Sequence, residues 1–289
     1  MELSFSLNYL MQNSRGKMLR TVDAAAEICR AAGFRYIDYT PDFRSDGWAE
    51  KARRDRELFD TLGITVEQTH APFNRYQTHP DDIFPTYCKR AFEASKILGA
   101  KFVVVHADEY RTKDRFDGKE ILDFTYDYLA PYVEYCAKNG LVLAVENVFE
   151  DDTTRWPKID GRSRYTSCVE ELKDVIERFN TPTVMCCWDF GHAGVAYGKT
   201  DMADALKAVA KYVVCTHVHD NYYGCDLHLL PFLGDADWNK NLAPLKEVGY
   251  AGKLSLELVY GEFGDALAAD FMRFAHSAGK ELCDMFDKI

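Results

Sequence analysis

Short apolar runs and longer amphipathic stretches alternate along the whole chain. Several of the runs are nearly continuous in Val, Ile, Leu, Phe and Cys, which is typical of parallel strands buried on both faces. The stretches between them are long enough for helices that pack one face against a sheet. The expected strands are Leu3–Asn8, Phe34–Tyr39, Ile64–His70, Phe102–His106, Leu141–Glu146, Thr183–Asp189, Tyr212–His217 and Lys253–Leu258.

Glycines and capping residues mark the ends of several expected helices. Helices favour glycine just beyond their last turn, and three amphipathic stretches run up to such a position. Ser or Thr followed three or four residues later by Glu resembles a capping box, which predicts a helix start at Thr166-Ser167. The glycines that end the three stretches are Gly33, Gly99 and Gly140.

Eight strand–helix repeats with right-handed crossovers can close into a barrel. We therefore predict an α/β fold, a single (β/α)8 TIM barrel domain over residues 1–289, which is an ordinary length for that fold. An open doubly wound sheet is the alternative, but it needs a Gly-rich turn after an early strand, and the sequence has none. Longer loops at about 71–80, 107–118, 147–165 and 218–238 follow strands, on the catalytic face of such a barrel.

Charge and cysteine usage restrict the functional classes. The net charge is −11 and the sequence pI is about 5.2, which disfavours nucleic acid as a partner because a basic face is needed to bind phosphates. Nine cysteines occur without a Cys-x-x-Cys pair, so we expect buried free thiols in a reducing compartment. No signal-peptide pattern or membrane-length apolar run is present, which predicts a cytoplasmic protein without membrane contact.

Acids and histidines recur where the expected strands end. Six of the eight histidines fall at strand ends or in the loops just after them, where random placement would put roughly one or two. The strand-end residues are His70, His106, Glu146, Asp189, His217 and Glu257. The residues that follow in the loops are His192, His219, Asp226 and His228.

The sequence around the two glutamates favours a metal site. Glu146 and Glu257 lie in apolar strands, where an ionised carboxylate is costly unless it is paired or binds a metal. Carboxylates with imidazoles suit a divalent cation such as Mn²⁺, Mg²⁺, Co²⁺ or Zn²⁺. The alternatives are an ion pair of Glu257 with Lys253 or with an arginine from a loop, and histidines that only make hydrogen bonds.

At these residues the sequence resembles the xylose-isomerase-like barrel superfamily, which contains sugar isomerases, ketose 3-epimerases and metal-dependent apurinic endonucleases. The resemblance covers essentially the whole chain, through short motifs whose order and spacing are together specific. The motifs are Thr69-His-Ala-Pro72, Val105-His106, Val145-Glu-Asn147, Trp188-Asp-Phe-Gly-His192, His217-Val-His-Asp220, Asp226-Leu-His228 and Glu257.

The resemblance implies that Glu146, Asp189, His217 and Glu257 bind the principal metal, and that Glu146 and Glu257 transfer protons. His217 is preferred to His219 because the family's ligand is followed by an acid three residues on, here Asp220. Substrate contacts or a second metal are implied for the remaining residues of the constellation, which are His70, His106, His192, His219, Asp226 and His228.

The sequence also departs from its relatives. The ketose 3-epimerases carry an arginine pair shortly after the strand-seven histidine, whereas this chain reads Asn221-Tyr-Tyr-Gly-Cys225. Their substrate pattern therefore does not carry over. The positions of the extra zinc ligands of the endonucleases are filled, by His70, His106, Asp226 and His228.

Three functions follow as hypotheses. The first is a metal-dependent isomerase or epimerase that acts on a small sugar or sugar phosphate through an enediolate. The second is a multi-zinc phosphodiesterase resembling the apurinic endonucleases, with a basic groove at Arg111, Lys113 and Arg115. The third is a polyol or keto-acid dehydratase that uses the same site. Dimers and tetramers are common in the families that the sequence resembles, so a homo-oligomer is one expectation.

Overall fold

The computed structural model describes most of the chain. The residues that it describes are 1–13, 15–73, 83–107, 117–150, 162, 164–222, 224–258 and 262–289. Arg111, Lys113 and Arg115 lie outside them, as do parts of all four expected long loops.

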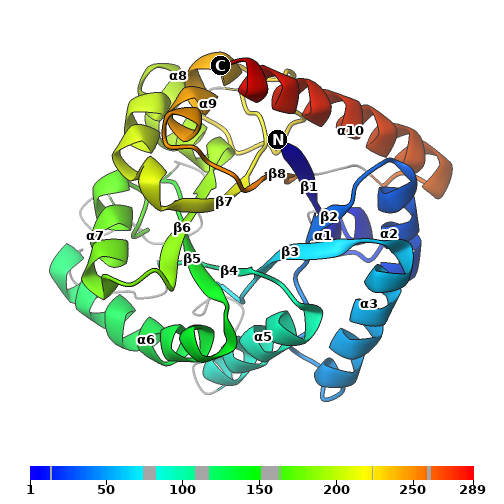
Figure 1. Ribbon diagram of the computed structural model, residues 1–289, viewed down its shortest axis with the longest axis horizontal. Coiled ribbons are helices and arrows are strands. Elements are labelled where there is room, and N and C mark those ends of the chain that lie inside the picture. Colours follow the sequence, from blue (N-terminus) through cyan, green and yellow to red (C-terminus); the bar gives the residue numbers. More distant parts are fainter. Residues whose placement is uncertain are drawn as a thin grey trace.

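Eight parallel strands stand in sequence order around the centre of the molecule (Figure 1). From β1 to β7 each strand pairs with the next along the chain, and β1 pairs with β8 from Glu2↔Lys253 to Phe5↔Leu256. The predicted (β/α)8 barrel is therefore confirmed. The strands are β1 (Glu2–Ser6), β2 (Tyr36–Asp38), β3 (Thr65–His70), β4 (Phe102–Val105), β5 (Val142–Glu146), β6 (Val184–Asp189), β7 (Val213–His217) and β8 (Lys253–Leu256).

Backbone hydrogen bonds join β7 to β8, the two strands at the ends of the sheet order. The N–H of Val218 donates to the carbonyl of Ser255 at 2.7 Å, and the N–H of Glu257 donates to the carbonyl of Val218 at 3.1 Å. These bonds lie just past β7 and at the end of β8, so they join the two strands at the end of the barrel where the acids and histidines were predicted to gather.

Helices form a ring outside the strands (Figure 1). Gly99 and Gly140 follow α5 and α6 in the left-handed conformation, as predicted. No described helix has the length and hydrophobicity needed to span a bilayer. The helices are α1 (Leu7–Met11), α2 (Val22–Ala31), α3 (Trp48–Leu62), α5 (Phe84–Leu98), α6 (Gly118–Asn139), α7 (Val169–Phe179), α8 (Phe190–Val209), η1 (Ala210–Tyr212), α9 (Trp238–Glu247) and α10 (Asp265–Lys288).

Two local predictions were wrong. The first strand was expected to reach Asn8, but it ends at Ser6 and the chain turns into the short helix α1. The capping box at Thr166 is only half formed: the Glu171 carboxylate accepts from the backbone N–H of Thr166 at 3.0 Å, but α7 begins after Cys168, whose side chain makes no capping bond. The Thr166 hydroxyl instead donates to the carbonyl of Glu146 at 3.2 Å and thus ties the loop to the end of β5.

The core lies between the strands and the surrounding helices, with a smaller apolar cluster formed by Val104, Ala144, Cys187 and Cys215. None of the nine cysteines forms a disulfide, and seven of them are buried. This agrees with the prediction of buried thiols. Apolar side chains fill the space between the strands and helices, and the polar site residues gather at one end of the barrel.

Candidate metal centre

All ten predicted site residues gather at one end of the barrel. They form three groups, and within each group the ligand atoms lie within 4.8 Å of one another. The first group is Glu146, Asp189, His217 and Glu257; the second is His70, His106 and Glu146; the third is His192, His219, Asp226 and His228.

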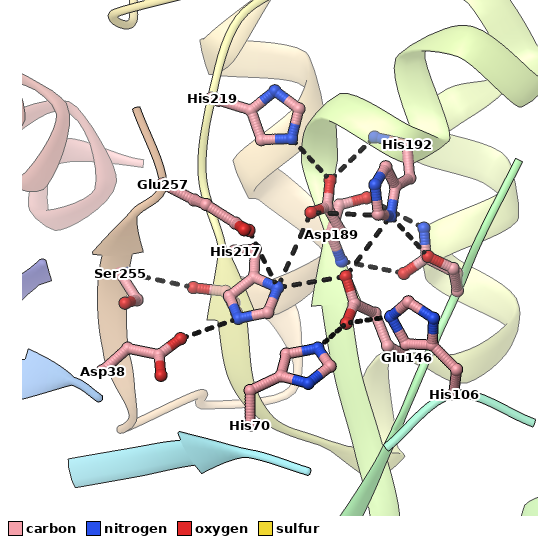
Figure 2. A network of polar contacts seen from close by, with 12 residues as sticks. Asp38, His70, His106, Glu146, Asp189, His192, His217, His219, Ser255 and Glu257 are labelled. Carbon is pink, nitrogen blue, oxygen red and sulfur yellow. Dashed lines mark hydrogen bonds and ion pairs between the residues drawn. The ribbon is translucent and has the colours of Figure 1, made fainter. Parts of the chain in front are cut away.

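The first group, which we call the cup, surrounds Nδ1 of His217 with three carboxylates (Figure 2). This atom lies 3.0 Å from Oε1 of Glu146, 3.2 Å from Oε2 of Glu257 and 3.7 Å from Oδ2 of Asp189. The residues come from β5, β6, β7 and the end of β8, so the closure of the barrel brings them together. Lys253 pairs with Glu2 and not with Glu257, which removes the ion pair with Lys253 as an alternative.

The second group contacts the far oxygen of Glu146. Nε2 of His70 lies 3.1 Å and Nε2 of His106 lies 3.2 Å from Oε2 of Glu146. Oε1 of the same carboxylate faces His217 and, at 3.3 Å, Nδ1 of His192. Both oxygens of this buried glutamate therefore face imidazole nitrogens, and Glu146 is shared between the first two groups.

Backbone carbonyls fix the rings of three histidines. Nδ1 donates to a carbonyl oxygen in His70 (Ala71, 2.7 Å), His192 (Asn147, 2.9 Å) and His228 (Glu257, 3.1 Å). A hydrogen bond on one nitrogen leaves the other as the donor atom for a metal and holds the ring plane in place. These three side chains are therefore oriented in the manner of metal-binding histidines.

The charges in the cup shift its pKa values strongly. Burial alone would raise the pKa of Glu146, but the positive charge of His217 and hydrogen bonds from neighbouring histidines outweigh it and hold the pKa well below its ordinary value. Burial alone would lower the pKa of His217, but Glu257 and Glu146 hold it well above its ordinary value. Without an ion, the positive charges of protonated imidazoles balance the negative charges of the carboxylates.

Buried donor atoms without partners fit a cation. Asp189 is fully buried, and its Oδ2 has no hydrogen-bond partner among the described residues. Oδ1 of Asp226, a member of the third group, is likewise a buried oxygen without a hydrogen-bond partner among the described residues. A buried carboxylate oxygen without a partner is costly, and an ion would satisfy it. Two glutamates, an aspartate and an imidazole are suitable donors for a divalent metal.

Sequence reasoning missed two residues that contact the cup. Oδ2 of Asp38, at the end of β2, lies 3.0 Å from Nε2 of His217. The phenol of Tyr9, on α1, donates a hydrogen bond to Oε1 of Glu257. Asp38 could have been found, because it is an acid in an apolar strand, as Glu146 is. Tyr9 could not, because the predicted first strand ran up to Asn8 and hid the turn into α1.

The carboxylate of Asp220 holds the loop after β7 in place beside the site. This carboxylate accepts hydrogen bonds from the backbone N–H groups of Asn221, Phe232 and Ala236 and from Nε1 of Trp238. The fold of this loop places Asp226 and His228 opposite His192. Asp220 therefore shapes the loop, while His217 is the histidine that lies among the three carboxylates.

A cavity of about 1010 Å³ opens above the cup. Tyr9, His70, His192, Phe149 and Glu257 are among the residues that line it. Its volume is at the upper end of the range of small-molecule sites. The cup is therefore accessible to a small polar molecule, with aromatic side chains beside the polar ones.

Comparisons with known proteins agree with this architecture. Protein y4fM of Sinorhizobium fredii is 23% identical over 290 residues, which cover 90% of this chain and 88% of y4fM. A D-tagatose 3-epimerase-like protein superposes with a TM-score of 0.71 at 20% identity, covering 100% of this chain and 99% of the other. IolI, whose structure holds a zinc atom, gives a TM-score of 0.74 at 21% identity with the same coverage. Residues 26–277 match the family described as xylose isomerase-like TIM barrel, so the chain belongs to that family.

Proposed function

We propose that the chain is a divalent-metal-dependent isomerase or epimerase of a small sugar or sugar phosphate. One observation carries this proposal: three carboxylates and Nδ1 of His217 converge at the floor of a cavity large enough for a sugar. The metal would be Mn²⁺, Mg²⁺, Co²⁺ or Zn²⁺, held by Glu146, Asp189, His217 and Glu257. Structural relatives that are described as a sugar epimerase-like protein and as a zinc-containing protein support the same class.

The residues of the cup divide the chemistry between them. A bound metal would polarise a substrate carbonyl and the neighbouring hydroxyl, which makes the hydrogen on the adjacent carbon more acidic. Glu257 is partly exposed and borders the cavity, so it is placed to take that proton. For epimerisation Glu146, on the other side of the cup, would return a proton to the opposite face. His192, which also borders the cavity, would orient a substrate hydroxyl.

Solvent exchange tests this function without knowledge of the substrate. Free and phosphorylated ketoses would be incubated with the protein in D2O, with each of the four metals supplied in turn. The proposal predicts metal-dependent incorporation of deuterium at the carbon next to the carbonyl of at least one ketose, together with a new isomer or epimer. A dehydratase would instead give a product that has lost water. If no compound exchanges with any metal, the proposal is wrong.

A multi-zinc phosphodiesterase is the second candidate, and the three neighbouring donor groups favour it. Clustered metals activate a hydroxide and stabilise a leaving oxygen. The net charge of −11 weighs against a nucleic-acid substrate. Metal analysis of the purified protein separates the candidates, because two or three tightly held zinc ions favour the nuclease and one exchangeable Mn²⁺ or Mg²⁺ favours sugar chemistry.

A further inference from the structure

A small cavity lies behind the metal centre, between α8, α9 and the loop after β7. Its volume is about 30 Å³, which is space for about two water molecules. It borders His219 and Asn241, and neither residue is more than 1% exposed. Apart from these two, the residues that shape it include Gly191, Gly194, Gly198 and Asp220.

Four buried polar atoms on these two side chains lack hydrogen bonds. Neither Oδ1 nor Nδ2 of Asn241 has a partner among the described residues, and the same holds for Nδ1 and Nε2 of His219. The two residues come from different elements, since Asn241 lies on α9 and His219 just after β7. Buried polar groups of this kind are normally satisfied by ordered water when no protein atom reaches them.

His219 connects this cavity to the cup. Its Nε2 lies 3.1 Å from Oδ1 of Asp189, although the ring is not oriented for a hydrogen bond (Figure 2). One face of the ring stacks on His228, with 3.9 Å between the centroids and 7° between the planes. A Cβ atom at Gly191 would lie 1.7 Å from Cε1 of His219, so only glycine fits beside the ring. Packing therefore holds the plane of the imidazole between Gly191 and its neighbours.

The other histidines show what His219 lacks. His70, His192 and His228 each donate Nδ1 to a backbone carbonyl, which fixes the proton and the ring. In His219 the nitrogen closest to a carboxylate is Nε2, and the negative charge of Asp189 favours the proton there although the ring is not aligned for a hydrogen bond. Nδ1 is then an acceptor that needs a donor, and the amide of Asn241 is a polar group that borders the same cavity.

We propose that ordered water in this cavity joins the amide of Asn241 to Nδ1 of His219, and that Asn241 and His219 together position Asp189 as a metal ligand. Asn241 is thus a positioning residue that acts through His219. The inference rests on the proposed metal cup, because Asp189 is one of its four ligands. Removing the outer partner of a metal ligand typically weakens metal affinity about 10- to 100-fold. Asn241 acts on the ligand Asp189 only through His219, so we expect a loss at the lower end of that range.

Asn241→Leu tests the inference without any substrate. The substitution keeps a similar volume and removes the amide, so a purely structural role predicts an unchanged affinity and an equal or higher melting temperature. We expect the variant to stay folded and to bind Mn²⁺ and Zn²⁺ about tenfold more weakly in calorimetric titrations, with unchanged stoichiometry. Asn239→Leu is the matched control, since it makes the same change on the exposed side of α9 and should leave affinity at the wild-type value.

His219→Asn and a high-resolution crystal structure complete the test. A positioning role predicts that His219→Asn weakens binding and keeps the number of bound ions, whereas loss of one ion would show His219 to be a direct ligand and would overturn the inference. The crystal structure should show water between Asn241 and His219. Wild-type affinity in Asn241→Leu, or a dry cavity, would contradict the inference alone. A wild-type protein that binds neither ion would contradict the metal cup as well.

Discussion

Oδ2 of Asp38 lies 3.0 Å from Nε2 of His217, on the side of the ring opposite the three carboxylates of the cup. A carboxylate in this position fixes which nitrogen carries the proton and makes the other a better metal ligand. Both side chains are buried, so water does not weaken the contact. The contact also links β2 to β7 across the barrel, which ties the orientation of a proposed ligand to a residue outside the cup.

Asp38→Asn should weaken metal binding while leaving the barrel folded. The amide keeps the shape of the side chain but removes the charge that holds His217, so affinity for Mn²⁺ should fall about 10- to 100-fold. Calorimetric titration measures the affinity, and circular dichroism checks the fold. Wild-type affinity in this variant would show that His217 does not depend on Asp38.

Glu257→Gln and Glu146→Gln should each abolish measurable turnover in the exchange assay. A glutamine cannot accept the proton, and positioned acid–base groups typically contribute about 10²- to 10⁴-fold to the rate. Cys186→Ser is the control, because this thiol lies in the apolar core and is not among the ligand groups. Full activity in either glutamine variant would refute the role of that glutamate.

Tyr9→Phe should lower kcat more than it changes metal affinity. The phenol donates to Oε1 of Glu257, whereas Oε2 is the oxygen that faces His217. Its loss frees Glu257 to rotate but removes no metal ligand, so the ion should remain bound. Steady-state kinetics together with metal analysis would test this. A variant that loses its metal would instead place Tyr9 among the residues that hold the ion.

Stability of the ion-free protein should fall in alkaline solution. Burial lowers the pKa of His192 and His228, but Asp189 raises that of His192 to about 10 and Asp226 raises that of His228 to about 9. Because an unfolded imidazole titrates near pH ~6.5, the stability gained from these ion pairs is complete below that pH. It is lost as the pH rises through 9 and 10.

Metal should remove much of this alkaline loss, because the ion binds the deprotonated imidazoles. Urea unfolding between pH 6.5 and 10, with EDTA or with saturating Zn²⁺, measures both effects. Identical pH profiles in the two conditions would contradict this account of the charges.

The strand pattern predicted the barrel and the members of the site, because parallel strands in sequence order must place their ends on one rim. His217 and Glu257 could be named for that reason alone. Contacts that depend on packing could not be predicted, such as the turn into α1 that brings Tyr9 to Glu257. The cavity beside Asn241, which three glycines help to line, depends on how α8 and α9 pack, and no periodicity shows that. The single domain over residues 1–289 and the roles of the site residues stay predictions.

The most direct test is anomalous diffraction from crystals soaked in Mn²⁺, recorded at a wavelength where manganese scatters anomalously. The account predicts a peak bounded by the carboxylates of Glu146, Asp189 and Glu257 and by Nδ1 of His217. A peak elsewhere, or none at this place while the four side chains keep their positions, would contradict it.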